Sequence, residues 1–151
     1  MKTLVLATGT CRNAPMLALE AEYYSRIPAP LRPVVKELPD GPTAAHTEAA
    51  QRKALQGVKG AMVVMLDETG QQFTSRAFAE TLNDAATRGT KHLVFLIGGA
   101  EGLSTAIKAE AAWVMGLGKF TLPHQLVRVV LAEQLYRAHT LITGHPYHRG
   151  G

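Results

Sequence analysis

Residues 93–137 decide how this chain folds. They begin with LVFLIGGAEGL (93–103) and end with WVMGLGKFTLPHQLVRVVLAEQLYR (113–137), with a short amphipathic segment between the two. Each quoted piece opens on an apolar run and continues into a loop that contains glycine, and the second piece ends in the most apolar helix that the sequence predicts. Short, unbroken apolar runs are typical of strands buried on both faces of a parallel sheet. The stretch therefore predicts two such strands, two loops and a helix.

The rest of the chain alternates between strand and helix patterns in the same way. Apolar runs predict strands at residues 2–8, 34–38, 61–66, 92–97 and 113–117. Periodicity and capping residues predict helices at 14–25, 43–56, 75–88, 104–111 and 125–140, and residues 67–72 are predicted as a loop. Strands that alternate with helices indicate an α/β fold with a parallel sheet covered by helices on both faces.

Composition places the chain among single-domain globular proteins. It has 151 residues, of which 46% are hydrophobic and 19% charged, so residues 1–151 are treated as one domain. The net charge of +4 is compatible with a polyanionic partner but does not identify one.

Cys11 is the only cysteine, which excludes an internal disulfide. The histidines lack the cysteine and carboxylate ligands that would accompany them in a metal site. The apolar runs are too short for a signal peptide or a membrane helix, so we expect a cytoplasmic protein.

The loops after three of the predicted strands should meet in space. In a parallel sheet the loops after the strand carboxyl ends open on one edge, where ligands bind, so loops 67–72, 98–103 and 118–124 should converge. The GGAEG loop at 98–102 lacks the spacing of a dinucleotide-binding G-x-G-x-x-G motif, and the chain has no G-K-[ST]. Glu101 would repel a phosphate, so a ligand with an adenosine and no phosphate suits this loop better. The alternative is a tight turn with helix-capping glycines.

The last predicted helix has almost no polar face in its first two turns. Its apolar residues there are Leu126, Val127, Val129, Val130 and Leu131. A helix that is apolar all round must be buried all round, either by its own domain or by a second subunit, and we expect a homodimer. Arg128 lies among these residues. It either lays its stem along the apolar surface or faces a ligand or anion beside loop 118–124.

The segment HPYHR at residues 145–149 is polar and aromatic, and its proline limits its freedom. One interpretation is a frayed terminus. The other is that Tyr147, His148 and Arg149 fold over the ligand edge and meet a nucleobase or a phosphate, as aromatic and arginine side chains do with splayed RNA bases.

Several of these motifs resemble the RlmH family of SPOUT-class methyltransferases. The resemblance is carried by FLIGGAEGL (95–103), TLPHQLVRVVLAEQLYRA (121–138) and HPYHR (145–149), and more loosely by LDETGQQFTSRAFA (66–79) and LVLATGT (4–10). It runs from the first strand to the tail and is poorest between residues 28 and 60. Gly118 stands where a serine is usual. Region 39–57 is shorter and less basic than usual, which reduces the expected contribution of its helix to RNA binding.

The resemblance implies a fold and an activity that composition cannot show. The fold would be an α/β knot in which the C-terminal segment is threaded through a loop, and the protein would be a homodimer. It would bind S-adenosylmethionine in the knot and methylate N3 of a pseudouridine in a stem-loop of 23S ribosomal RNA on the assembled ribosome. With the glycines of loop 98–102 included, the implied cofactor-binding residues are Leu66, Gly98, Gly99, Gly102, Leu117, Gly118, Lys119, Phe120, Thr121 and Leu122.

The residues that would assist the chemistry are hypotheses at this stage. Direct methyl transfer requires alignment of the reactants and a group that accepts the proton of the N3 imide. Tyr147 or His148, from the tail of a partner subunit, are candidate acceptors, and Arg128 is a candidate for stabilising negative charge on a uracil oxygen. The modest charge predicts weak binding to naked RNA, so the expected partner is 23S rRNA in the ribosome. The alternatives are a SPOUT methyltransferase that acts on tRNA and a non-catalytic ribosome-associated binding protein.

Overall fold

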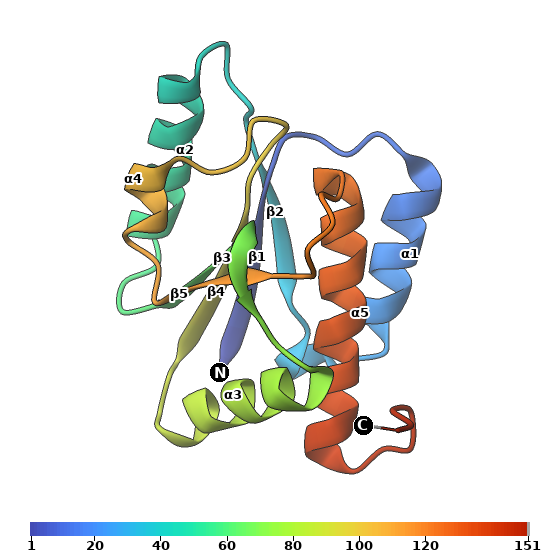
Figure 1. The fold of residues 1–151 in the computed structure, drawn as a ribbon. Helices are drawn as coiled ribbons and strands as arrows, with labels where there is room; N and C mark the ends of the chain where they lie inside the picture. Colours follow the sequence, from blue (N-terminus) through green and yellow to red (C-terminus); the bar gives the residue numbers. More distant parts are fainter. Residues whose placement is uncertain (151) are drawn as a thin grey trace.

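Five parallel strands form the centre of the molecule. In the computed structural model, which describes residues 1–150, the strands are β1 (Lys2–Thr8), β2 (Val34–Leu38), β3 (Met62–Gln72), β4 (His92–Ile97) and β5 (Trp113–Gly116). They are arranged in the order β2-β1-β4-β3-β5, and every neighbouring pair is parallel (Figure 1). The predicted α/β fold with a parallel sheet is confirmed.

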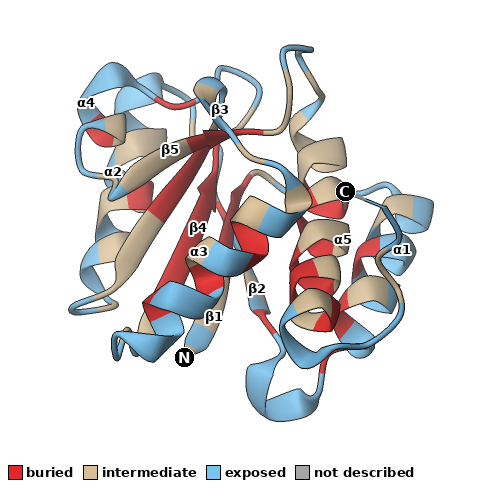
Figure 2. Cartoon of the chain, turned by 60° about the horizontal axis from the view of Figure 1, so that its bottom comes forward, coloured by how far each residue is buried: buried red, intermediate tan, exposed pale blue. Residues whose placement is uncertain are grey.

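Helices cover both faces of this sheet. They are α1 (Ala14–Ser25), α2 (Ala44–Gln56), α3 (Ser75–Thr87), α4 (Thr105–Lys108) and α5 (His124–Thr143), with a 3-10 turn, η1, at Ala29–Leu31. The helices α1, α3 and α5 pack on one face, and α2 and α4 pack on the other (Figures 1 and 2). Neighbouring residues of a strand point to opposite faces. Phe95 of β4 therefore joins the core under α1, α3 and α5, whereas Leu96 joins the core under α2 and α4.

Side-chain caps fix where most of the helices begin. A side-chain atom accepts a hydrogen bond from a backbone N–H of the first turn at Asn13, Thr43, Thr74 and Ser104. Because the first N–H groups of a helix have no partner within it, such a residue marks the start. The predicted helix starts at residues 14 and 75 agree with the structure, and the start predicted at residue 104 differs by one residue, because Ser104 is the cap of α4. Three predicted ends differ, since α3 ends one residue earlier at Thr87, α4 stops at Lys108 after one turn, and α5 continues to Thr143.

The prediction of a loop at residues 67–72 is wrong, because β3 continues through it. A register shift between Leu66 and Gln71 forms a bulge, after which Gln71 pairs with Met115 of β5. Gly70 permits this approach, since a Cβ there would lie 2.7 Å from the backbone carbonyl carbon of Met115. The stretch is polar and has no alternation of apolar residues, so it gave no strand pattern.

The most apolar helix, α5, packs between α1 and α3 (Figure 2). Val129 and Leu131 are buried there, whereas Leu126, Val127 and Val130 are half-buried. One chain therefore covers much of this helix by itself, which was one of the two predicted alternatives, and the homodimer stays a prediction. Within residues 1–150, no helix is long and apolar enough to cross a membrane.

Candidate ligand-binding site

A cavity of about 690 Å³ opens at the carboxyl edge of the sheet. Its wall is formed by residues 66–68, 97–103, 117–118 and 120–124, together with Met115 and Val127. These residues come from the ends of β3, β4 and β5, from the segments that follow them and from the start of α5. The three segments that were expected to converge therefore meet at one cavity, whose volume is typical of small-molecule sites.

Hydrogen bonds hold the cavity wall together. The hydroxyl of Thr121 donates to the carboxylate of Glu68, which joins the segment after β5 to the extension of β3. In the glycine loop, the backbone N–H of Gly102 donates to the carbonyl oxygen of Gly99 at 3.0 Å, so the loop folds back on itself. Gly98 has no room for a side chain here, because its Cβ would lie 2.8 Å from the backbone of Gly102. Contacts within a single chain therefore fix the shape of this wall.

The cavity wall is acidic. Its ionisable residues are Asp67, Glu68, Glu101 and His124, and no lysine or arginine lines it among the residues described. Burial alone would raise the pKa of Asp67. Hydrogen bonds from Thr69 and the nearby ammonium group of Lys108 outweigh this effect and hold that pKa below its ordinary value. Asp67 is therefore ionised at neutral pH, so the wall attracts cations and repels phosphates. In residues 1–150 no cluster of His, Cys, Asp and Glu is suited to hold a metal ion.

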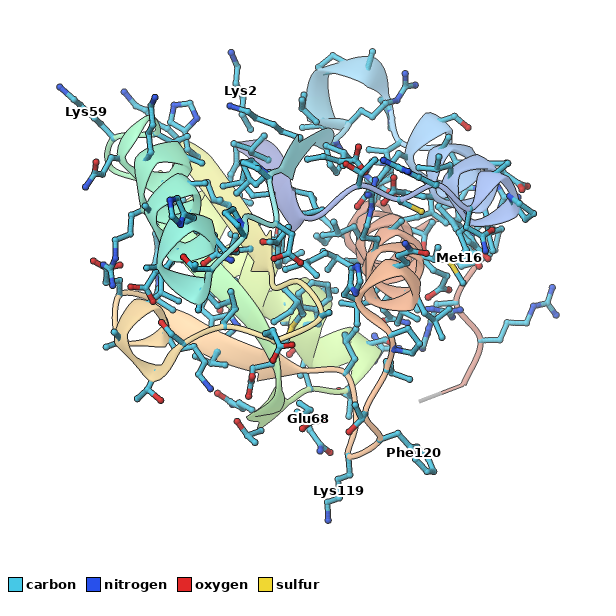
Figure 3. The ribbon with its side chains drawn as sticks, turned by 90° about the horizontal axis from the view of Figure 1, so that it is seen from above. Lys2, Met16, Lys59, Glu68, Lys119 and Phe120 are labelled. Carbon is cyan, nitrogen blue, oxygen red and sulfur yellow. The ribbon has the colours of Figure 1, made fainter. Side chains whose placement is uncertain are left out.

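Most of the predicted cofactor-binding residues line this single cavity: Leu66, Gly98, Gly99, Gly102, Leu117, Gly118, Phe120, Thr121 and Leu122. Lys119 does not line it, because its side chain is exposed and points outward (Figure 3). That these residues bind a cofactor stays a prediction. Asp67, Glu68 and His124 were not among the predicted site residues, although their positions directly after the apolar part of β3 and at the start of α5 place them at the same edge.

Arg128 lies in a buried ion-pair network and not in the cavity wall. Its Nε and Nη2 donate to the two carboxylate oxygens of Glu20 at 2.9 Å each, and its Nη1 donates to Glu37 at 2.6 Å. The backbone N–H of Cys11 donates to the same oxygen of Glu37. The hydrogen bonds to Glu20, followed by those to Glu37, raise the pKa of the Arg128 guanidinium despite its burial. The predicted contact with a uracil oxygen stays untested, and this geometry favours a structural role.

The tail folds back onto α5, so it is not frayed. The ring of Tyr147 packs on that of Tyr136, with the ring centroids 4.6 Å apart. The hydroxyl of Tyr147 donates to Glu133 at 3.2 Å, and Nδ1 of His148 lies 3.1 Å from Nη1 of Arg137. The start of α5 borders the cavity, and Tyr136 follows it by 12 residues, which correspond to about 18 Å along the helix axis. Their contacts with Tyr136, Glu133 and Arg137 thus place Tyr147 and His148 away from the cavity of their own chain, and the C-terminal segment lies toward the other end of α5 (Figure 1).

Fold and site together define an α/β protein with a parallel sheet and an acidic ligand cavity at the carboxyl edge of that sheet. Comparison with known proteins narrows this class. A family model described as "Predicted SPOUT methyltransferase" matches residues 1–148. Two proteins named Ribosomal RNA large subunit methyltransferase H are similar over 99% of this chain and 99% of their own length: the one from Paramagnetospirillum magneticum is 40% identical, and the one from Rhizobium meliloti is 42% identical.

The chain belongs to the SPOUT methyltransferase family and is therefore an enzyme. The resemblance that the motifs indicated is confirmed over the full length of the chain.

Proposed function

We propose that this enzyme uses S-adenosylmethionine to methylate N3 of a pseudouridine in a stem-loop of 23S ribosomal RNA, on the assembled ribosome. Two relatives that match its full length are named as methyltransferases of large-subunit ribosomal RNA. The structural observation that supports the proposal most directly is the acidic cavity bordered by glycines at the carboxyl edge of the sheet.

The cavity suits a ligand that is cationic and has no phosphate. When bound, S-adenosylmethionine supplies a methyl group that is already activated by the positive charge of its sulfonium. The carboxylates of Asp67, Glu68 and Glu101 would attract this charge, whereas they would repel the phosphates of a dinucleotide. The glycines of loop 98–102 let a nucleoside approach the backbone closely. By holding the ligand against this wall, the chain would also align it with an incoming base.

We propose that the tail of a second subunit completes the site. Tyr147 and His148 lie away from the cavity of their own chain, so a homodimer is the arrangement that would bring them to a neighbouring cavity. Burial and the neighbouring Glu133 raise the pKa of Tyr147, so its phenol keeps its proton at neutral pH. Of the two candidates for accepting the N3 proton, the imidazole of His148 is therefore the better one.

Arg128 has a positioning role in this proposal. It ties α5, whose first residues border the cavity, to α1 through Glu20 and to β2 through Glu37.

The proposal also includes the knot implied by the family resemblance. In its support, the chain crosses from β4 over β3 to reach β5 and then returns to the face that carries α1 and α3.

Two measurements test the proposed function. Calorimetry should detect binding of S-adenosylmethionine, and mass spectrometry should find the target pseudouridine unmethylated in ribosomes from a strain that lacks this protein. Because the net charge is only +4, assembled ribosomes should be a better substrate than naked 23S rRNA. A methyl group missing from tRNA would indicate the tRNA-directed alternative. A chain that does not bind S-adenosylmethionine would contradict the proposed cofactor.

A further inference from the structure

Phe120 is the most exposed large hydrophobic side chain within residues 1–150, with 86% of its surface accessible. It contributes to the cavity wall, and its ring points outward beside Lys119 (Figure 3). Single exposed apolar residues are common on protein surfaces. This one is informative because it stands at the mouth of a ligand cavity and next to a cation.

The bend that carries Phe120 has a glycine turn before it and a hydrogen-bonded anchor after it. Gly118 precedes it with φ at +137°, a backbone conformation that residues with a side chain rarely adopt. Thr121 follows it and donates a hydrogen bond to Glu68 of β3. The ring is therefore presented to solvent from a held segment, which lowers the conformational entropy lost when a partner packs against it.

We propose that Phe120 stacks on an unpaired base of the RNA substrate while Lys119 contacts a neighbouring phosphate. This inference rests on the proposed function. A base in a stem-loop is accessible to an enzyme only after it leaves its stack, and an aromatic ring that replaces the lost neighbour stabilises the unstacked state. At the cavity mouth, Phe120 is placed to be that ring.

The charges around the cavity let a neutral RNA base approach and keep the negatively charged RNA backbone outside. Asp67, Glu68 and Glu101 in the wall repel phosphate, so the RNA backbone has to pass outside the mouth while a neutral base approaches it. Lys119 is exposed on the outer side of the same bend and offers a cation to that backbone (Figure 3). One dipeptide thereby supplies the two kinds of contact that single-stranded RNA requires, stacking and charge.

Steady-state methylation of ribosomes tests the inference. In Phe120→Ala the KM for ribosomes should rise roughly tenfold, the effect of losing one base–aromatic stack, and this rise should exceed any rise in the Kd for S-adenosylmethionine, whose cavity Phe120 also lines. Phe120→Trp should keep the KM near wild type, because an indole ring also stacks on bases. Lys119→Gln should weaken the dependence of KM on salt, and Lys119→Arg should preserve it.

Leu31→Ala is the matched control. Leu31 is 47% exposed and lies on η1, which leads into the amino end of β2, at the edge of the sheet opposite the cavity. Its removal should leave the KM unchanged. The inference is overturned if Phe120→Ala has the wild-type KM or if its defect lies wholly in the cofactor Kd. It is also overturned if light scattering shows that Phe120→Ala separates subunits that stay together in the wild type. A wild-type chain that neither binds S-adenosylmethionine nor methylates ribosomes would instead overturn the proposed function.

Discussion

Arg128 links three elements through one side chain. Only 5% of it is exposed, and it holds Glu20 of α1 and Glu37 of β2 against α5. These partners lie 108 and 91 positions away in the sequence. No local pattern could therefore distinguish an arginine that pairs inside the chain from one that faces a ligand.

Arg128→Ala should lower the free energy of unfolding by about 3–5 kcal/mol, because Glu20 would keep a buried charge without its partner. Urea unfolding at pH 7 measures this change. Arg26→Ala is the control. Arg26 pairs with Glu22 at the end of α1 and lies over the rings of Tyr23 and Tyr136, but 41% of its side chain is exposed, so its removal should lower stability much less than Arg128→Ala. Equal stabilities of the two variants would rule out the buried network as a stabilising feature.

Glu37 should make the same network sensitive to acid. The backbone N–H of Cys11, and next the Arg128 guanidinium, hold the pKa of Glu37 below its ordinary value of 4.5. A carboxylate whose pKa is lower in the folded chain stabilises that chain above its ordinary pKa, and this contribution is lost as the pH falls through the folded pKa. Glu37→Gln should therefore be less stable than wild type at pH 7. It should also lose less stability below pH 4.5. Melting temperatures measured against pH check this, and parallel curves would show that Glu37 is not responsible.

At the scale of elements, burial determined what the sequence could predict. The carboxyl half of β1 and nearly all of β4 are buried, so their apolar runs stand out, and side-chain caps mark the helix starts. The extension of β3 is the exception. Its residues 67–72 are half-buried or exposed, and they reach β5 only through a bulge. Their strand conformation comes from pairing with a neighbour and not from their own hydrophobicity.

Gly70 is the position at which this pairing can be broken by one methyl group. A Cβ there would lie 2.7 Å from the backbone carbonyl carbon of Met115 and 2.8 Å from the nitrogen of Gly116, and a backbone cannot swing aside as a side chain does. Gly70→Ala should lower the free energy of unfolding by about 1–3 kcal/mol. It should also weaken binding of S-adenosylmethionine, because the neighbouring Glu68 and Asp67 belong to the cavity wall.

Urea unfolding and calorimetry measure the two effects of Gly70→Ala. Gly57→Ala serves as the control, since Gly57 ends α2 with φ at −70°, a conformation that alanine adopts freely. Gly57→Ala should change the stability little and leave the cofactor affinity unchanged. Wild-type behaviour of Gly70→Ala in both measurements would mean that the β3–β5 pairing tolerates the added methyl group and does not shape the cavity.

For the whole molecule, the sequence could predict where the loops meet but not where the tail goes. Parallel strands place their carboxyl ends on one edge whatever their side chains are, so the convergence of loops 98–103 and 118–124 followed from topology. The packing of Tyr147 on Tyr136 depends on how two helical turns and a returning tail fit together, which no periodicity encodes. Because the tail lies away from its own cavity, the proposed site needs a second subunit.

Mixed dimers test this shared site. Gly98→Val should block the cofactor loop, since its side chain would meet the backbone of Gly102, while its tail stays intact. His148→Ala should retain the cofactor loop and lack the proposed proton acceptor. Each variant alone should be nearly inactive. In a random mixture half of the dimers combine both chains, and each of these has one intact site of two, so about a quarter of wild-type activity should return.

The measurement is methylation of ribosomes by the co-refolded mixture, with native mass spectrometry to verify that mixed dimers form. If the tail served the cavity of its own chain, neither site of a mixed dimer would be intact, and activity would stay at the level of the separate variants. A monomeric mass for the wild-type chain would exclude the shared site directly. Recovery of activity, in contrast, requires that the cofactor loop of one chain and His148 of the other serve the same site, although the fold holds Gly98 and His148 apart within each chain.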